Sequence, residues 1–190
     1  MPGWPGATAI IASQLASSII ASQFELMEAR MAANPTRRSI EIDKKVPAFS
    51  RPSTSGVWKL GDAAGKKLVL YFYPKDNTTG CTLEGQAFSE LHSQFKKANT
   101  IIVGVSPDPI ASHEKFKNKM SFPFELLADE DRTLCELFGV WKEKSMYGRK
   151  FMGVERSTFL IDETGVLRHE WRKIKVPGHS AAVLEAAKSL

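Results

Sequence analysis

Cys81 is the residue best placed for chemistry in this 190-residue sequence. It comes shortly after the apolar run 68–73 and opens a stretch in which apolar residues recur at helical spacing. In the first turn of a helix, exposed backbone N–H groups and the positive end of the helix dipole favour a thiolate. The position therefore indicates a reactive thiol, with a small buried hydrophobic residue as the alternative, because most free cysteines are of that kind.

Three residues before Cys81 could assist it. Thr78 lies one turn upstream, so its hydroxyl can turn back towards the sulfur. Pro74 fixes the entry of the loop and can shield the thiolate from water, and Gly80 lets the backbone approach a small ligand closely. The segment is suited to nucleophilic chemistry on a small substrate.

Three continuous apolar runs predict strands that are buried on both faces of a parallel sheet. They are 68–73, 101–105 and 157–161. Residues 162–165 have turn chemistry, so we expect the third strand to continue into a hairpin with residues 166–171. Ligand chemistry is expected where the parallel strands end, and the loop that leads to Cys81 follows the first of them.

Helical stretches alternate with these strands. The first carries a stripe of residues on one face, namely Glu84, Phe88, Leu91 and Phe95. The others are expected at about 109–120, around 134–138, and from 178 to the C-terminus. The alternation predicts one α/β domain over residues 39–190, with a central mixed sheet flanked by helices.

Residues 1–38 differ in composition and are expected to form an N-terminal extension, either helical or poorly ordered. They contain an imperfect repeat, 10–14 and 19–23, and apolar residues at helical spacing. One interpretation is a helix that docks on a partner or a membrane surface. We favour the other, an appended or mis-started N-terminus, because termini are often poorly held and Met27 and Met31 could each serve as a start.

Composition and charge are those of an ordinary globular protein, with 43% hydrophobic and 25% charged residues. A formal net charge of +5 is weak evidence for a nucleic-acid partner. No apolar segment has the length of a transmembrane helix, and no basic segment precedes the apolar stretch near the N-terminus, as a secretory signal requires. We expect a cytoplasmic protein that binds neither nucleic acid nor membrane, with its two cysteines reduced.

The spacing of Pro74, Thr78 and Cys81 resembles the active-site signature of the peroxiredoxins, Pro-x-x-x-Thr-x-x-Cys. The wider stretch 71–82, YFYPKDNTTGCT, is similar to that of the bacterioferritin comigratory protein (Q-type) subfamily. Further similar segments follow in order, at 129–131, 138–141, 156–162 and 177–179. The resemblance covers about residues 40–190 and implies a thioredoxin-like fold.

The resemblance implies a thiol-dependent peroxidase that reduces hydrogen peroxide and organic hydroperoxides and needs no metal or other cofactor. Cys81 matches the peroxidatic cysteine, whose thiolate attacks a peroxide oxygen and becomes a sulfenic acid. Thr78 matches the threonine whose hydroxyl hydrogen-bonds the peroxide and the sulfur. Backbone N–H groups near Gly80 and Cys81 should complete a pocket for the developing negative charge.

Arg156 matches the arginine that a later strand brings to the thiol in this family. Its guanidinium would stabilise the thiolate and donate to the peroxide oxygens. Without the resemblance, Arg156 would be interpreted as a solvated charge at a strand end. Glu84 stands where the subfamily often has an acidic residue, and we expect it to orient the arginine.

Two positions depart from the subfamily pattern. Thr79 replaces the usual proline before the Gly-Cys pair, which removes no reacting group. Gln86 stands where many members carry a resolving cysteine, so a disulfide within the first helix is excluded.

Cys135 is the only other thiol, and two interpretations of it stay open. We favour a packed helical residue without a redox role. In the alternative, Cys135 resolves Cys81 after local unfolding, within the chain or across a dimer. The favoured interpretation implies a one-cysteine cycle in which thioredoxin, glutaredoxin or a small thiol reduces the sulfenic acid, in a monomer or weak homodimer.

A second function class is a thioredoxin-fold redox sensor or holdase with little turnover, suggested by the missing resolving cysteine and the unusual N-terminal segment. A disulfide oxidoreductase is disfavoured, because the sequence has no C-x-x-C. His92, His113, His169 and His179 lack the spacing of metal ligands, and no nucleotide-binding glycine motif is present.

Overall fold

The computed structural model describes residues 40–146 and 148–190. Its strands are β1 (Ser50–Ser53), β2 (Gly56–Lys59), β3 (Lys67–Phe72), β4 (Thr100–Ser106), β5 (Glu125–Ala128), β6 (Trp141–Met146), β7 (Arg149–Val154), β8 (Ser157–Ile161) and β9 (Leu167–Arg172). Its helices are the 3-10 helix η1 (Leu60–Ala63), α2 (Thr79–Lys97), α3 (Ile110–Met120), α4 (Thr133–Leu137) and α5 (His179–Ser189). The predicted extension over residues 1–38 lies outside the described residues.

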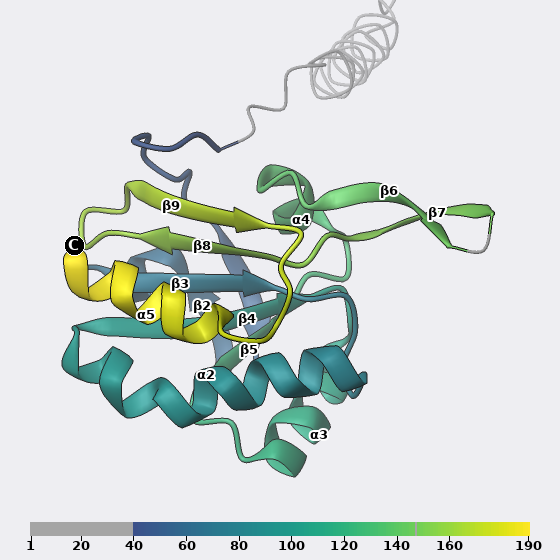
Figure 1. Cartoon of the computed structure of the whole chain (residues 1–190), viewed down its shortest axis with the longest axis horizontal. Coiled ribbons are helices and arrows are strands. Elements are labelled where there is room, and N and C mark those ends of the chain that lie inside the picture. Colours follow the sequence, from purple (N-terminus) through teal and green to yellow (C-terminus); the bar gives the residue numbers. More distant parts are fainter. Residues whose placement is uncertain (1–39, 147) are drawn as a thin grey trace, which may run out of the picture. The chain divides into compact units, whose positions relative to one another are not determined.

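Seven strands form one mixed sheet in the order β2-β1-β5-β4-β3-β8-β9 (Figure 1). β3 pairs in parallel with β4, and β4 with β5, whereas β8 runs antiparallel to β3 and continues into β9. The predicted mixed sheet flanked by helices is confirmed, and the three apolar runs form its adjacent strands β4, β3 and β8. Among the described residues, no helix is long and apolar enough to cross a bilayer.

The alternating side chains of β3 divide the core into two clusters. On one face, Tyr71 packs against Phe88 of α2, with ring centroids 4.9 Å apart. The same cluster includes Phe116 of α3 and Val183 of α5, so these three helices cover this face. Burial of aromatic and aliphatic side chains of this size is the main stabilising contribution to the domain.

The second cluster lies on the other face of the sheet. Its centre is formed by three phenylalanines: Phe72 of β3, Phe138 directly after α4, and Phe159 of β8. The ring centroids of Phe72 and Phe138 are 5.1 Å apart, and those of Phe138 and Phe159 are 4.8 Å apart. Cys135 of α4 belongs to this cluster, whereas Cys81 of α2 belongs to the first. The sheet therefore separates the two thiols.

The β6–β7 hairpin is not predicted from the sequence. Within the described part of the chain, its strands pair only with each other, in a separate two-stranded sheet. Phe151 and Met152 are 43% and 49% exposed, and Lys150 forms an ion pair of 3.0 Å with Glu143 across the strands. Because neither face of the β6–β7 hairpin is buried along its length, its sequence lacks the alternation of apolar and polar residues that indicates a strand.

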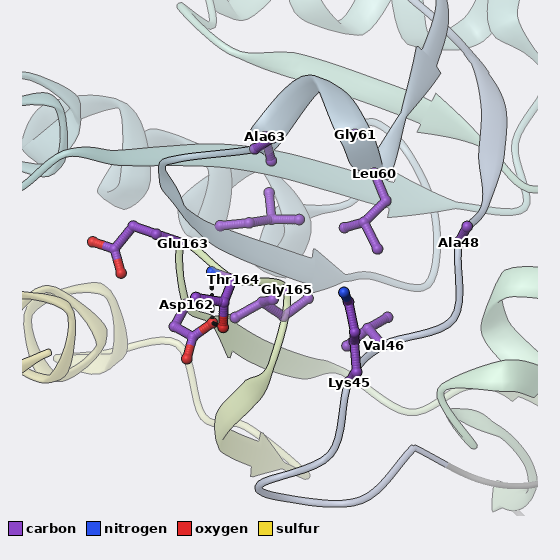
Figure 2. Close-up of a pocket in the computed structure, with 13 residues that line it drawn as sticks. Lys45, Val46, Ala48, Leu60, Gly61, Ala63, Asp162, Glu163, Thr164 and Gly165 are labelled. Carbon is purple, nitrogen blue, oxygen red and sulfur yellow. Dashed lines mark hydrogen bonds between the residues drawn. The ribbon is translucent and has the colours of Figure 1, made fainter.

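A pocket of about 310 Å³ opens at the amino end of β3 (Figure 2). Val46, Leu60, Leu68 and Ile161 line it, together with the turn at residues 162–165. Leu68 is at the start of β3, whereas the loop that leads to Cys81 follows the end of this strand. The pocket and Cys81 therefore lie at opposite ends of β3.

Gly104 of β4 permits the close approach of two buried side chains. A Cβ atom at this position would lie 2.7 Å from the Tyr71 ring and 2.8 Å from Leu126. Gly104→Ala should lower the free energy of unfolding by about 1–3 kcal/mol, because a packed core cannot yield to the extra methyl group. Urea unfolding measures this difference.

Gly61→Ala is the matched control, because a Cβ atom there meets nothing within 4 Å. Its free energy of unfolding should stay within about 0.5 kcal/mol of that of the wild type. Equal stability of the Gly104→Ala and Gly61→Ala proteins would show that the packing around Tyr71 is looser than described.

Candidate active site

Cys81 lies in the first turn of α2, directly after the loop that leaves β3. The helix begins after Thr78, whose backbone is extended with φ −84° and ψ 150°. The first N–H groups of any helix have no partner within the helix, so they point at whatever lies beyond its amino end. Cys81 is 2% exposed, and its sulfur lies at the part of the helix where anionic groups are stabilised.

Arg156 reaches Cys81 from the strand that borders β3. Phe72 at the end of β3 pairs with Ser157 at the start of β8, so the preceding residue, Arg156, lies beside the start of the loop. The Arg156 Nη2 group donates a hydrogen bond of 3.2 Å to the Cys81 Sγ atom. Antiparallel pairing of two strands thus brings together residues that are 75 positions apart.

Glu84 holds the other side of the same guanidinium. Its Oε2 atom accepts a short hydrogen bond from Arg156 Nη1, and the two groups form an ion pair. Burial raises the pKa of the Glu84 carboxyl to about 7, and the charge of Arg156 opposes this shift. Burial acts to lower the pKa of Arg156, but the interactions with Glu84 and Cys81 raise it by more, so the pKa of Arg156 lies above its ordinary value.

Gly80 leaves the space that Arg156 occupies. A Cβ atom at position 80 would lie 3.3 Å from Arg156 Nη2. A side chain there would press on the nitrogen that donates to Cys81. The structure therefore brings together four of the predicted residues, namely Gly80, Cys81, Glu84 and Arg156.

Pro74 and Thr78 lie in the exposed part of the loop. The Thr78 hydroxyl donates a hydrogen bond of 3.1 Å to the backbone carbonyl of Lys75, the only side-chain bond of Thr78 within residues 40–146 and 148–190. It thus stays within the loop, whereas we expected it to turn back towards the sulfur. Because the donated proton goes to Lys75, the lone pairs of the hydroxyl stay free to accept.

Lys144 is a second cation that sequence analysis did not assign to the site. Its ammonium donates a hydrogen bond of 2.5 Å to the carbonyl of Val154, at the end of the hairpin that leads to Arg156. Burial and the positive charge of Arg156 lower the pKa of Lys144. The hairpin thereby adds positive charge near the thiol, but its polar sequence gives no sign of this.

Cys135 lies in a different environment. It is fully buried, and its backbone N–H donates a hydrogen bond of 2.7 Å to the Asp129 carboxylate. Burial, and then the charge of Asp129, raise the pKa of the Cys135 thiol. Both cysteines are free, and they face opposite clusters of the core.

His113 and Asp76 form a buried pair that sequence analysis missed. The His113 Nδ1 atom lies 2.9 Å from the Asp76 carboxylate, next to the loop that leads to Cys81. The two residues are 37 positions apart and share no periodic pattern, so only the fold brings them together. No group of three or more His, Cys, Asp or Glu within the described part of the chain could hold a metal ion.

Alkylation should distinguish the two thiols in the folded protein. N-ethylmaleimide is expected to modify Cys81 and to leave Cys135 unmodified. Both thiols are buried, but Arg156 donates a hydrogen bond to the Cys81 sulfur, whereas burial and then the charge of Asp129 raise the pKa of the Cys135 thiol. Peptide mass mapping reads both sites, and protein unfolded in urea is the control in which both react. Equal modification of both thiols in the folded protein would contradict the difference between their environments.

Glu84 should also leave a signature in the pH dependence of stability. Its pKa in the folded protein, about 7, lies above its ordinary value of 4.5. Between these values the folded state retains a proton that the unfolded state has released, so the contribution of Glu84 to the free energy of unfolding falls as pH rises.

Glu84→Gln removes this titration and keeps the size of the side chain. The free energy of unfolding of the wild type minus that of Glu84→Gln should therefore decrease from pH 4.5 to about 7. Urea unfolding of both proteins at several pH values gives this difference. A difference that rises with pH would mean that the ion pair with Arg156 dominates over burial.

Comparisons with known proteins identify the family of the chain. Residues 42–170 match the AhpC/TSA family. A putative peroxiredoxin bcp of Coxiella burnetii is 48% identical over 77% of this chain and 97% of its own length. Peroxiredoxin Bcp of Bacillus subtilis is also 48% identical, over 80% of this chain and 98% of its own.

Solved structures show the same fold. The bacterioferritin comigratory protein of Xanthomonas campestris, studied for its alkyl peroxide reduction activity, aligns with a TM-score of 0.71 and 46% identity, over 74% of this chain and 90% of its own. Peroxidoxin BcpB of Mycobacterium tuberculosis aligns with a TM-score of 0.71 and 28% identity, over 80% of this chain and 98% of its own. The expected thioredoxin-like fold and the expected family are confirmed, and the chain belongs to the AhpC/TSA family as a peroxiredoxin of the bacterioferritin comigratory protein (Q-type) group.

Proposed function

We propose that Cys81 is the peroxidatic thiol of this chain and that it reduces hydrogen peroxide and organic hydroperoxides. The observation that carries the proposal is the hydrogen bond of 3.2 Å from Arg156 to the Cys81 sulfur at the amino end of α2. An always-charged donor and a helix N-terminus both favour the thiolate over the thiol. Organic hydroperoxides are included because the similar Xanthomonas campestris protein is described by its alkyl peroxide reduction activity.

In the reaction, the Cys81 thiolate attacks one oxygen of the peroxide R–O–O–H. The S–O bond forms as the O–O bond breaks, and the sulfur loses two electrons to the peroxide. The products are Cys81 sulfenic acid and an RO⁻ ion, which takes up a proton and leaves as ROH. Negative charge thus moves from the sulfur to the departing oxygen during the step.

Arg156 is positioned to follow this movement of charge. Its guanidinium holds several N–H donors in one plane, so one nitrogen can stay with Glu84 while another donates to the sulfur and then to the peroxide oxygens. Backbone N–H groups at Gly80 and Cys81 add donors at the same point. Thr78 contributes a hydroxyl that can accept a hydrogen bond from the peroxide O–H, while Pro74 shapes the loop.

The sulfenic acid is proposed to return to the thiol by a one-cysteine cycle. Gln86 offers no second thiol in the first turns of α2, and Cys135 is buried on the other face of the sheet. Two external thiol groups therefore supply the two electrons, forming one disulfide and releasing water. Thioredoxin, glutaredoxin or a small cytoplasmic thiol has the required chemistry.

A redox sensor or holdase is the second candidate, and the burial of Cys135 is the observation that favours it. Such a protein would oxidise once at Cys81 and stop. Repeated consumption of peroxide in the presence of a thiol reductant separates the two candidates, because only the peroxidase turns over.

Substitutions at the site should separate the roles of its residues. Cys81→Ser should abolish peroxide consumption, and Arg156→Ala should slow oxidation of Cys81 on the order of a hundredfold or more, the scale of losing a donor to a developing oxyanion. Stopped-flow kinetics with hydrogen peroxide measure the oxidation rate. Arg168→Ala is the matched control, since Arg168 pairs with Asp162 at the other end of the β8–β9 hairpin.

Cys135→Ser should retain most of the turnover, because the proposed cycle does not use this thiol. Intact-mass spectra after one equivalent of hydrogen peroxide should show a sulfenic-acid adduct on Cys81 when a trapping reagent is present. A loss of two hydrogens that maps to a disulfide between Cys81 and Cys135 would instead make Cys135 the resolving thiol. Near-normal oxidation rates in the Arg156→Ala protein would overturn the assignment of the site.

A further inference from the structure

We propose that His113, as an imidazolium ion paired with Asp76, is a positioning residue for Cys81. The proposal rests on the proposed function of Cys81. It assigns to His113 the task of holding the loop between β3 and α2, from which the reactive thiol projects. His113 lies on α3, outside the cysteine motif, and does not touch the sulfur.

Both ring nitrogens of His113 face oxygen acceptors. Nδ1 lies 2.9 Å and 3.1 Å from the two carboxylate oxygens of Asp76, and Nε2 lies 3.0 Å from the carbonyl oxygen of Leu127. A carbonyl has no proton to give, so Nε2 must carry a hydrogen for this bond to exist. A hydrogen on Nδ1 as well makes the ring a cation, which matches the charge of the ionised Asp76 carboxylate.

The surroundings of Asp76 keep its carboxylate ionised. The Tyr73 hydroxyl donates a hydrogen bond of 2.8 Å to Oδ1 of Asp76, and the Ser112 hydroxyl donates one of 2.7 Å to Oδ2. Burial acts to raise the pKa of Asp76, but hydrogen bonds from His113, Ser112 and Tyr73 lower it overall. Burial also raises the pKa of Tyr73, so this hydroxyl retains the proton that it donates. The proton needed on Nδ1 therefore resides on His113.

The pair lies in the interior, where an unmatched charge is unfavourable. His113 is fully buried and Asp76 is 5% exposed. Removal of one partner leaves the other charge without compensation, so the remaining group must move towards water or change its protonation. Asp76 belongs to the loop, and any movement of its side chain therefore moves the loop.

A second bond ties the backbone of the loop to the same region. The Asp76 backbone N–H donates a hydrogen bond of 2.9 Å to the Asp108 carboxylate. This carboxylate also accepts a hydrogen bond of 2.7 Å from the Ser106 hydroxyl. Asn77 follows with a positive φ of 56°, a conformation that asparagine adopts more readily than most residues other than glycine. α2 starts shortly afterwards, so the anchor at Asp76 determines where Cys81 stands relative to Arg156.

His113→Gln tests the proposal. It removes the cation and retains an amide of similar size. Oxidation of Cys81 by hydrogen peroxide, followed by stopped flow, should slow about 10- to 100-fold, the scale expected when a reacting group is displaced by an ångström or less. His169→Gln on the exposed face of β9 is the matched control and should oxidise at the wild-type rate.

A spectroscopic measurement separates positioning by an ion pair from general support of the fold. Nitrogen-15 NMR of the imidazole rings at neutral pH should show both His113 nitrogens protonated in the wild type, and the signature should be lost in Asp76→Asn. A neutral His113 ring in the wild type would overturn the proposal. Oxidation rates are compared under conditions where urea unfolding shows every variant to be fully folded.

Ser112→Ala is a second, milder variant for the case in which His113→Gln does not fold. It removes one hydrogen bond to Asp76 from a half-buried position and should slow oxidation by about two- to fivefold. Wild-type rates in the folded variants would overturn the positioning role and leave the function of Cys81 intact.

If the wild type itself fails to oxidise, the proposed function is wrong. The rate at which iodoacetamide alkylates Cys81 then decides the positioning role, because alkylation needs no peroxidase activity. A slower rate in His113→Gln than in His169→Gln would support positioning, and equal rates would overturn it.

Discussion

The guanidinium of Arg156 is the group on which the site depends, because it is shared between a sulfur and a carboxylate that are both almost fully buried. Two groups that can each carry a negative charge lie one helical turn apart on α2, at Cys81 and Glu84. Without a cation between them, they would disfavour each other's ionised forms. The arginine makes their closeness stable and directs positive charge at the thiol.

The topology of the sheet fixes the position of Arg156 relative to Cys81. β8 borders β3 in antiparallel pairing, so the residue that precedes β8 is held at the edge where β3 ends and α2 begins. On the opposite flank, α3 contributes His113, which pairs with Asp76 of the connecting loop. The loop is thus fixed from two sides, by an arginine that contacts the thiol and by a histidine that contacts the loop itself.

Much of this could be predicted from the sequence, for reasons that differ between residues. Apolar runs revealed β3, β4 and β8, because strands buried on both faces need continuous hydrophobicity. Cys81 was recognisable from its position before a helix, whereas Arg156 depended on a family resemblance, since nothing local marks it. The β6–β7 hairpin and the buried His113–Asp76 pair were missed, because exposed strands lack an apolar pattern and a tertiary ion pair has no sequence period.

The separation of the two cysteines by the sheet has a consequence for damage under oxidative stress. A sulfenic acid that finds no partner thiol within its own chain persists until an outside molecule meets it. During that interval a second peroxide can convert it to the sulfinic acid, which ordinary thiols do not reverse. In the proposed cycle, an external thiol and a second peroxide therefore compete for the same sulfenic acid. The reductant supply of the cell, rather than the fold, then sets the peroxide concentration that the enzyme tolerates.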